Sequence, residues 1–304
     1  MLHSIKFKPN LIANRGLDST HRVAVFSPQF RRRQNHSRIV MILSVLIYLL
    51  LTGCEGNHYP ITSTIQSGVK GKAGEHTPIV RDTEGNLFGY YEYLPLNFSP
   101  DQGRLPLVFY WNGANAISGD GKTDLPGLLN QGLAQYIDQG QHFPAIIITA
   151  QLHYNDWKTI DIDPFITYIL KRYQDVIDRQ RVYMTGFSAG GGLTMRYAIE
   201  HGNKLAAIMP VAPAIFFPQA ETDLSKISRL PSWIFHNEGD EVVSHDRSLA
   251  WHDVLKNSND QQHRLTIYPV EGHYAWQTVY SDANALAWLF AQINSNPPSL
   301  ESRE

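Results

Sequence analysis

The chain has little cysteine and little net charge, and both shortages narrow its possible functions. Cys54 is the only cysteine among 304 residues, which excludes an intrachain disulfide framework and a metal site built from several thiolates. The 26 lysines and arginines face 28 acidic residues, so the basic surplus of a nucleic-acid-binding protein is missing. Internal repeats and heptads are missing too. With 43% hydrophobic residues, the length suits one large α/β domain or two small ones.

The most apolar run, residues 39–51, is too short to cross a bilayer, which needs roughly 20 residues. It follows a basic segment, as in a secretory signal. The ending Leu51-Thr52-Gly53-Cys54 resembles the lipobox of bacterial lipoproteins, in which the cysteine sulfur receives a diacylglyceryl group before cleavage. The resemblance implies a signal peptide over 1–53, a lipid on Cys54, and export to the bacterial cell envelope with anchoring to a membrane.

Two alternatives to the lipoprotein interpretation stay open. The apolar run is also compatible with an uncleaved anchor or with a buried helix that carries an incidental cysteine, although the lipobox pattern favours the lipoprotein. The segment before the run is long for a signal peptide, but a start at Met41 leaves no positive charge ahead of the apolar residues.

The rest of the chain divides by composition into a tether, a domain and a tail. Residues 54–75 are rich in glycine, serine, threonine and lysine without apolar periodicity, which predicts a flexible tether. The domain is expected over 76–293. The polar tail 294–304 contains Pro297-Pro298 and is predicted to be disordered.

Apolar runs alternate with helix-period segments through the whole of residues 105–293. The predicted strands are Pro78–Arg81, Leu87–Leu94, Leu105–Trp111, Pro144–Ala150, Val182–Thr185, Ala206–Val211, Ser232–Phe235 and Arg264–Tyr268. This alternation predicts a mostly parallel central sheet with helices on both faces, joined by right-handed crossovers.

The most informative motif is Gly186-Phe187-Ser188-Ala189-Gly190, which matches the Gly-x-Ser-x-Gly elbow of serine hydrolases. A predicted strand precedes it and a helix-period segment, Leu193 to His201, follows it. A nucleophile on such a sharp turn stands clear of the sheet, and the flanking glycines remove Cβ atoms that would collide. Ser188 is therefore the candidate nucleophile.

A serine hydroxyl needs a base, and the base needs an acid that orients it. Asp240 follows one predicted strand after Ser188, and His273 follows the next. Both are expected at the sheet edge that carries the elbow. Three acids compete with Asp240, namely Glu238, Glu241 and Glu271, and each is expected to be a solvated loop carboxylate. Of the 13 histidines, His236 is expected near the floor of the site, while His245, His252 and His263 are expected at the surface.

An acyl-transfer site also needs hydrogen-bond donors for the oxyanion. One donor is expected to be the N–H of Ala189 at the start of the helix. The second is expected from the loop Asn112-Gly113-Ala114-Asn115, with the N–H of Ala114 as the donor.

Taken together, these segments resemble the phospholipase/carboxylesterase and polyhydroxybutyrate-depolymerase-like esterases of the α/β-hydrolase superfamily, often labelled prolyl-oligopeptidase-like. The resemblance covers roughly residues 80–293 and implies an α/β-hydrolase fold without a large lid domain. It implies a serine-dependent carboxylic ester hydrolase that acts through an acyl-enzyme, without metal or cofactor. One position departs from the pattern, because Asn112 stands where the family usually has histidine.

The sequence defines the substrate less closely than the catalytic residues. No insertion is long enough for a lipase lid, which favours a small or polymer-end ester. Ile215, Phe216 and Phe217 are expected either to line an acyl or aryl pocket or to pack in the core. Two other functions stay open: a serine peptidase of prolyl-oligopeptidase-like type, and a surface-binding lipoprotein without catalytic activity, since fold does not imply function.

Overall fold

The computed structural model describes residues 68–81, 88–153, 160–216, 222–258 and 261–300. The apolar run 39–51 and Cys54, on which the signal-peptide and lipidation hypotheses depend, lie outside these residues. Within them, no helix is long and apolar enough to cross a membrane.

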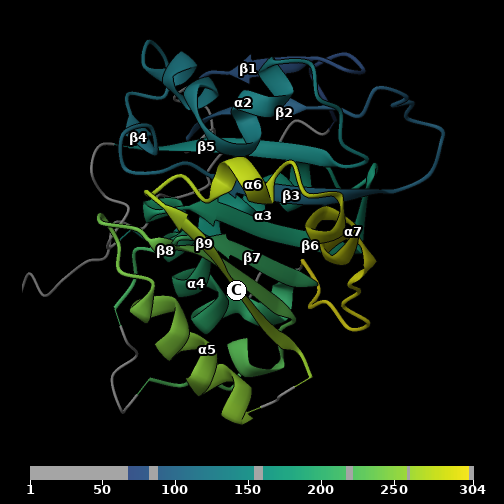
Figure 1. The fold of residues 1–304 in the computed structure, drawn as a ribbon. Coiled ribbons are helices and arrows are strands. Elements are labelled where there is room, and N and C mark those ends of the chain that lie inside the picture. The colour runs from purple at the N-terminus through teal and green to yellow at the C-terminus, as the bar shows by residue number, and fades with distance from the viewer. Residues whose placement is uncertain (1–67, 82–87, 154–159, 217–221, 259–260, 301–304) are drawn as a thin grey trace, which may run out of the picture. The chain divides into compact units, whose positions relative to one another are not determined.

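One sheet organises the domain, in the order β1-β2-β5-β3-β6-β7-β8-β9, with the short β4 beside β5 (Figure 1). The strands are β1 (His76–Ile79), β2 (Gly89–Tyr93), β3 (Leu105–Trp111), β4 (Ser118–Gly119), β5 (Ile146–His153), β6 (Ile177–Phe187), β7 (Ala207–Val211), β8 (Ser232–Gly239) and β9 (His263–Glu271). The first two pair antiparallel, and β2 is antiparallel to β5. From β5 to β9 all neighbours are parallel, so their carboxyl ends share one edge.

Helices cover both faces of this sheet. The α-helices are α2 (Gly132–Asp138), α3 (Asp163–Arg172), α4 (Ala189–His201), α5 (Asp246–Ser258), α6 (Trp276–Val279) and α7 (Ala283–Ala291); the 3₁₀ turns are η1 (Leu125–Asn130), η3 (Gly202–Lys204) and η4 (Ile227–Arg229). Successive side chains of a strand point to opposite faces of the sheet, so the strand residues belong to two apolar layers, one on each face. Phe109 and Trp111 of β3 join a cluster with α3, α4 and α5, whereas Val108 and Tyr110 join one with α2, α6 and α7.

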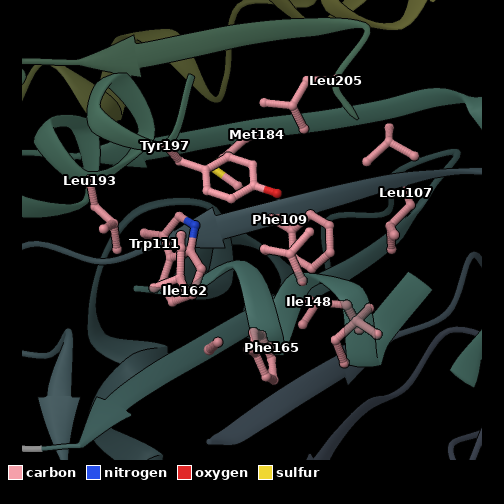
Figure 2. Close-up of a cluster of buried hydrophobic side chains, with 14 of the residues drawn as sticks. Leu107, Phe109, Trp111, Ile148, Ile162, Phe165, Met184, Leu193, Tyr197 and Leu205 are labelled. Carbon is pink, nitrogen blue, oxygen red and sulfur yellow. The ribbon is translucent and has the colours of Figure 1, made fainter. Parts of the chain in front are cut away.

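Figure 2 shows part of the first cluster, in which Phe165 of α3 and Leu193 of α4 lie among the strand side chains. The ring centroids of Phe165 and Trp111 are 6.2 Å apart. Every side chain of β3 after its first residue is buried, as a parallel strand covered on both faces requires. The predicted mostly parallel sheet with helices on both faces is confirmed.

The N-terminal side of the domain begins earlier than the sequence suggests. The Gly68 N–H donates to the Arg172 carbonyl at 2.8 Å, and the Gly71 N–H donates to the carboxylate of Glu92, which is fully buried. The last part of the predicted tether 54–75 is therefore fixed to the domain. Composition did not reveal this, because the contacts are mostly made by backbone N–H groups, with Val69 as the one apolar side chain of the described part of this segment that packs against the first cluster.

The C-terminal tail also differs from the expectation of disorder. The Asn294 N–H donates to the Gln180 carbonyl of β6 at 2.9 Å, and the Arg179 guanidinium donates to the Pro298 carbonyl at 3.1 Å. Leu300 packs against the first apolar cluster. Residues up to 300 are thus attached to the domain by polar contacts and by the side chain of Leu300, which a polar, proline-containing sequence does not indicate.

The start of α4 comes so close to the end of β3 that side chains are excluded there. A Cβ on Gly190 would lie 2.0 Å from the Trp111 carbonyl oxygen, and one on Gly186 would lie 2.5 Å from the Gly190 backbone. Both obstacles are backbone atoms, which cannot turn aside as a side chain can. The two outer glycines of the elbow are therefore required by the packing of β3, β6 and α4.

Replacing Gly190 by alanine is expected to lower the free energy of unfolding by about 1–3 kcal/mol or more, because the added methyl group overlaps a fixed carbonyl. Urea denaturation measures the loss. Gly127→Ala in η1 is the matched control, since nothing described lies within 4 Å of its Cβ position. Its effect is expected within about 0.5 kcal/mol. Equal unfolding midpoints for the two variants would contradict the packing argument.

Candidate active site

Ser188 occupies the turn between β6 and α4 in a strained backbone conformation. Its φ is 56° and its ψ is −114°, a region that residues with a Cβ seldom adopt. Three hydrogen bonds of 2.9 Å hold it there: the Ser188 N–H donates to the Val211 carbonyl, and the Ser188 carbonyl accepts from the N–H groups of Gly192 and Ala214. Strain of this kind persists only where the surroundings over-determine the backbone.

The structure brings Ser188, His273 and Asp240 into one hydrogen-bonded chain. Ser188 Oγ lies 2.8 Å from His273 Nε2, and His273 Nδ1 lies 2.6 Å from Asp240 Oδ2. Asp240 directly follows β8 and His273 lies two residues beyond β9, so both come from carboxyl ends of the strands. The Asp240 side chain is fully buried, whereas that of His273 remains 12% exposed. A substrate thus approaches the histidine and serine but not the carboxylate.

The loop that carries His273 is fixed to the neighbouring strand. The Gly272 N–H donates to the Gly239 carbonyl at 2.9 Å, and the Asn237 side-chain amide donates to the Gly272 carbonyl at 2.8 Å. Gly272 has a φ of 85°, which lets the chain turn toward Ser188. The Phe187 ring packs against the imidazole of His273, with 4.7 Å between the ring centroids.

The three acids that compete with Asp240 in the sequence do not reach the histidine. Glu238, Glu241 and Glu271 are all exposed. Among the hydrogen bonds and ion pairs of the described residues, only Asp240 provides His273 with a carboxylate partner.

Two other histidines are buried. His263 was expected at the surface, but it is 4% exposed and its Nδ1 lies 2.7 Å from Ser232 Oγ. This position is the first of β9, where the side chain turns inward toward β8 and burial lowers the pKa of the imidazole. His236, in β8, has no exposed surface, and its Nε2 lies 3.1 Å from Asp240 Oδ2. The sequence predicts His236 near the floor of the site, but no sequence feature indicates its hydrogen bond with Asp240.

The loop after β3 is fixed next to the elbow. Asn112 is fully buried, and its side-chain amide donates to the Leu128 carbonyl at 2.7 Å. The Gly113 N–H donates to Gln131 Oε1 at 3.0 Å. A Cβ on Gly190 would lie 2.6 Å from the Asn112 carbonyl oxygen, so the loop starts in contact with α4. Asn112 therefore serves here as a link to η1.

The two candidate oxyanion donors lie on either side of this contact. Ala189 is the first residue of α4, where backbone N–H groups have no intrahelical acceptor. Ala114 follows the fixed residues of the β3 loop and is exposed. Among the described residues, neither the Ala114 N–H nor the Ala189 N–H has a hydrogen-bond acceptor. Both groups are therefore free to bind a developing negative charge.

Of the three residues considered for an acyl or aryl pocket, the structure describes two. Ile215 is half-buried and packs against the first apolar cluster, whereas Phe216 is 74% exposed. The Arg247 guanidinium lies over the Phe216 ring at 4.4 Å from its centroid. Phe217 lies outside the described residues. Tyr274, which directly follows His273, is 61% exposed, and its ring centroid lies 6.4 Å from that of Phe187.

The arrangement suits nucleophilic acyl transfer. A serine hydroxyl, an imidazole and a buried carboxylate within hydrogen-bond distance form the relay that activates a weak nucleophile. No group of three or more potential metal ligands occurs in the parts of the chain that the structure describes.

Comparison with known proteins supports this fold. The sequence model of the phospholipase/carboxylesterase family matches residues 158–286, which include the elbow and the positions of the acid and histidine. A bifunctional acetylxylan esterase/xylanase from Neocallimastix patriciarum is 33% identical over 104 residues, which is 34% of this chain and 14% of that protein.

Solved structures of esterases share the fold. A thermostable esterase matches with a TM-score of 0.54 and 24% identity over 72% of this chain and 63% of its own. Esterase 2 of Thermogutta terrifontis matches with a TM-score of 0.53 and 13% identity over 73% of this chain and 97% of its own. A feruloyl esterase module from Clostridium thermocellum matches with a TM-score of 0.50 and 14% identity over 77% of this chain and 97% of its own. The chain is an α/β-hydrolase-fold protein, similar in sequence to the phospholipase/carboxylesterase family.

Asp240→Asn is expected to lower kcat on ester substrates by on the order of a thousandfold to ten-thousandfold, because an amide at this position favours the wrong tautomer of His273. Steady-state kinetics measures the change. Glu238→Gln is the matched control, since this neighbouring carboxylate is exposed and is expected to leave kcat unchanged. A similar loss in both variants would contradict the assignment of Asp240.

Proposed function

We propose that the protein is a serine-dependent carboxylic ester hydrolase that acts through an acyl-enzyme. The observation that carries the proposal is the continuous hydrogen-bonded chain from Ser188 Oγ through His273 to Asp240. The similarity to esterases supports an ester as the substrate. The strained backbone of Ser188 and its position at the carboxyl end of β6 support its role as nucleophile.

In the acylation step, Ser188 Oγ attacks the ester carbonyl carbon while His273 Nε2 takes the hydroxyl proton. Asp240 accepts the Nδ1–H of His273, which keeps Nε2 free to act as the base and stabilises the imidazolium that forms. The carbonyl oxygen gains a negative charge, and the N–H groups of Ala114 and Ala189 stabilise it. The imidazolium then returns the proton to the departing alcohol.

Deacylation repeats this chemistry with water. His273 takes a proton from the water molecule that attacks the acyl carbonyl, and the same two N–H groups hold the second oxyanion. Ser188 leaves with the proton from His273, which restores the free enzyme and releases the carboxylic acid. In both steps His273 carries the proton between the attacking and the leaving oxygen.

The surroundings of Ser188 favour small or polymer-end esters. Ala214, whose N–H binds the Ser188 carbonyl, precedes the exposed Phe216 by two residues. Tyr274 directly follows His273 and is also exposed. Exposed aromatic rings in these two loops support a substrate with a flat acyl or aryl group, because large planar side chains bind such groups by stacking.

A Ser188→Ala variant is expected to lose hydrolysis of p-nitrophenyl esters by on the order of a millionfold in kcat and to lose labelling by a fluorophosphonate probe, because the nucleophile is gone. Its Cβ is retained, so folding should be unaffected. The wild-type protein is assayed on acetyl, butyryl and feruloyl esters and on proline-containing anilides, with intact-mass measurement of the labelled protein.

Each result of that panel has a defined meaning. Faster cleavage of the anilides than of all esters would indicate a peptidase. A folded wild-type protein that cleaves neither class and takes up no probe would indicate a binding protein on a hydrolase scaffold. Unchanged labelling of Ser188→Ala would overturn the assignment of the nucleophile.

We also propose that the protein is exported and held at a membrane of the bacterial cell envelope by a lipid on Cys54. The sequence Leu51-Thr52-Gly53-Cys54 after an apolar run of signal-peptide length supports this. In the sequence, residues 55–67 lie between Cys54 and Gly68, the first described residue that contacts the domain.

Cys54→Ala is expected to release the protein from the membrane fraction and to abolish incorporation of radiolabelled palmitate, since the acceptor sulfur is removed. Fractionation of cells that express each form measures the release. Ser188→Ala leaves the N-terminal segment intact and serves as the control, which should stay membrane-bound. Retention of Cys54→Ala in the membrane fraction would refute the lipobox interpretation.

A further inference from the structure

A second histidine contacts the same carboxylate oxygen of Asp240 that His273 contacts. His236 is in β8 and its side chain has no exposed surface. Its Nε2 lies 3.1 Å from Asp240 Oδ2 and 2.9 Å from the Val243 carbonyl oxygen. Its Nδ1 lies 2.7 Å from Ser248 Oγ of α5.

These partners determine where the proton of His236 lies. Both neighbours of Nε2 are acceptors, so Nε2 must carry the hydrogen and donate it. Nδ1 is then the acceptor, and the Ser248 hydroxyl donates to it. Burial is the largest influence on the pKa of His236 and lowers it, although Asp240 and the Val243 carbonyl act in the opposite direction. A neutral imidazole with the proton on Nε2 agrees with every contact.

The contacts of Asp240 show what this donor adds. Asp240 Oδ1 accepts the N–H groups of Val242 and Val243, each at 2.9 Å. Asp240 Oδ2 accepts from His273 Nδ1 and from His236 Nε2. Among the described residues, the only other group that holds Oδ2 is His273, the histidine that Asp240 itself has to orient. His236 therefore provides an independent fixed point on that oxygen.

We propose that His236 is a positioning residue of the reaction: its Nε2–H holds Asp240 Oδ2 in line with His273 Nδ1, and Ser248 and α5 hold His236. This inference rests on the proposed hydrolytic function. His236 touches neither substrate nor Ser188, and it acts on the rate only through the orientation of Asp240. Loss of its Nε2 donor lowers kcat and leaves KM nearly unchanged.

The test compares two amides at this position. The side-chain nitrogen of glutamine reaches the place of Nε2, whereas that of asparagine reaches only the place of Nδ1. His236→Asn is expected to lower kcat by about ten- to a hundredfold, the cost of a lost hydrogen bond to a charged group. His236→Gln is expected to recover most of this loss. KM and the ratio of ester to anilide hydrolysis are expected to stay within about threefold of wild type.

His263 offers a matched control within the same chain. It is also buried, with Nδ1 at 2.7 Å from Ser232 Oγ and Nε2 at 3.0 Å from the Ser228 carbonyl oxygen, but it has no contact with Asp240. His263→Asn is expected to lower the unfolding temperature as much as His236→Asn does while kcat stays within about threefold. An equal loss of kcat in the two variants, or wild-type kcat in His236→Asn, would overturn the proposal.

A measurement on the wild-type protein keeps the proposal testable if the variants fail to fold. Nitrogen-15 NMR of the histidine rings is expected to show neutral His236 with its proton on Nε2, and a proton on Nδ1 would refute the arrangement. If the wild-type protein hydrolyses no ester, the proposed function fails separately. The rate of fluorophosphonate labelling then replaces kcat in the comparison of His236→Asn, His236→Gln and His263→Asn.

Discussion

The close approach of three backbone segments around Ser188 is the constraint on which the rest of the site depends. The serine has a positive φ, and its N–H and carbonyl are bound by Val211, Gly192 and Ala214. These bonds come from the end of β7, from the first turn of α4 and from the loop after β7. The strain is therefore distributed over the sheet and a helix, and the hydroxyl is presented at a fixed position.

The parallel arrangement explains why the other groups meet there. Asp240 and His273 follow β8 and β9, two neighbouring strands on the same side of β6. Each strand ends at the same edge, so residues separated by 33 and 85 positions come within hydrogen-bond distance. The loop after β3 reaches this edge from the other side of β6. The site thus needs no movement of the described elements to form its relay.

The three residues of the relay differ in how far they are buried. The Asp240 side chain is fully buried and receives four hydrogen bonds, so its orientation is fixed by the protein alone. His273 and Ser188 keep a small exposed surface, which a substrate carbonyl requires. A carboxylate shielded in this way interacts more strongly with the imidazole than an exposed one would, because the screening by water is reduced.

Local sequence features predicted the parts of the fold that depend on local physics. Alternating apolar runs predicted β3 with its bounds, Leu105–Trp111, and the glycines around Ser188 predicted the turn. The positions of Asp240 and His273 after successive strands followed from chain order. The attachment of 68–75 and 294–300 was missed because most of those contacts are made by backbone N–H groups, asparagine and arginine. Only single apolar residues, Val69 and Leu300, add to them, and the partners lie far away in the sequence.

The sequence by itself therefore determined the fold class and the candidate nucleophile, base and acid, since strand periodicity and turn chemistry are properties of neighbouring residues. Only the tertiary structure decided which of several nearby carboxylates faces His273 and that His236 and His263 are buried. It also decided that Phe216 is exposed whereas Ile215 packs against the core. These contacts and burials depend on which side chains the sheet and helices bring together from distant parts of the sequence. A pattern of neighbouring residues does not indicate such contacts.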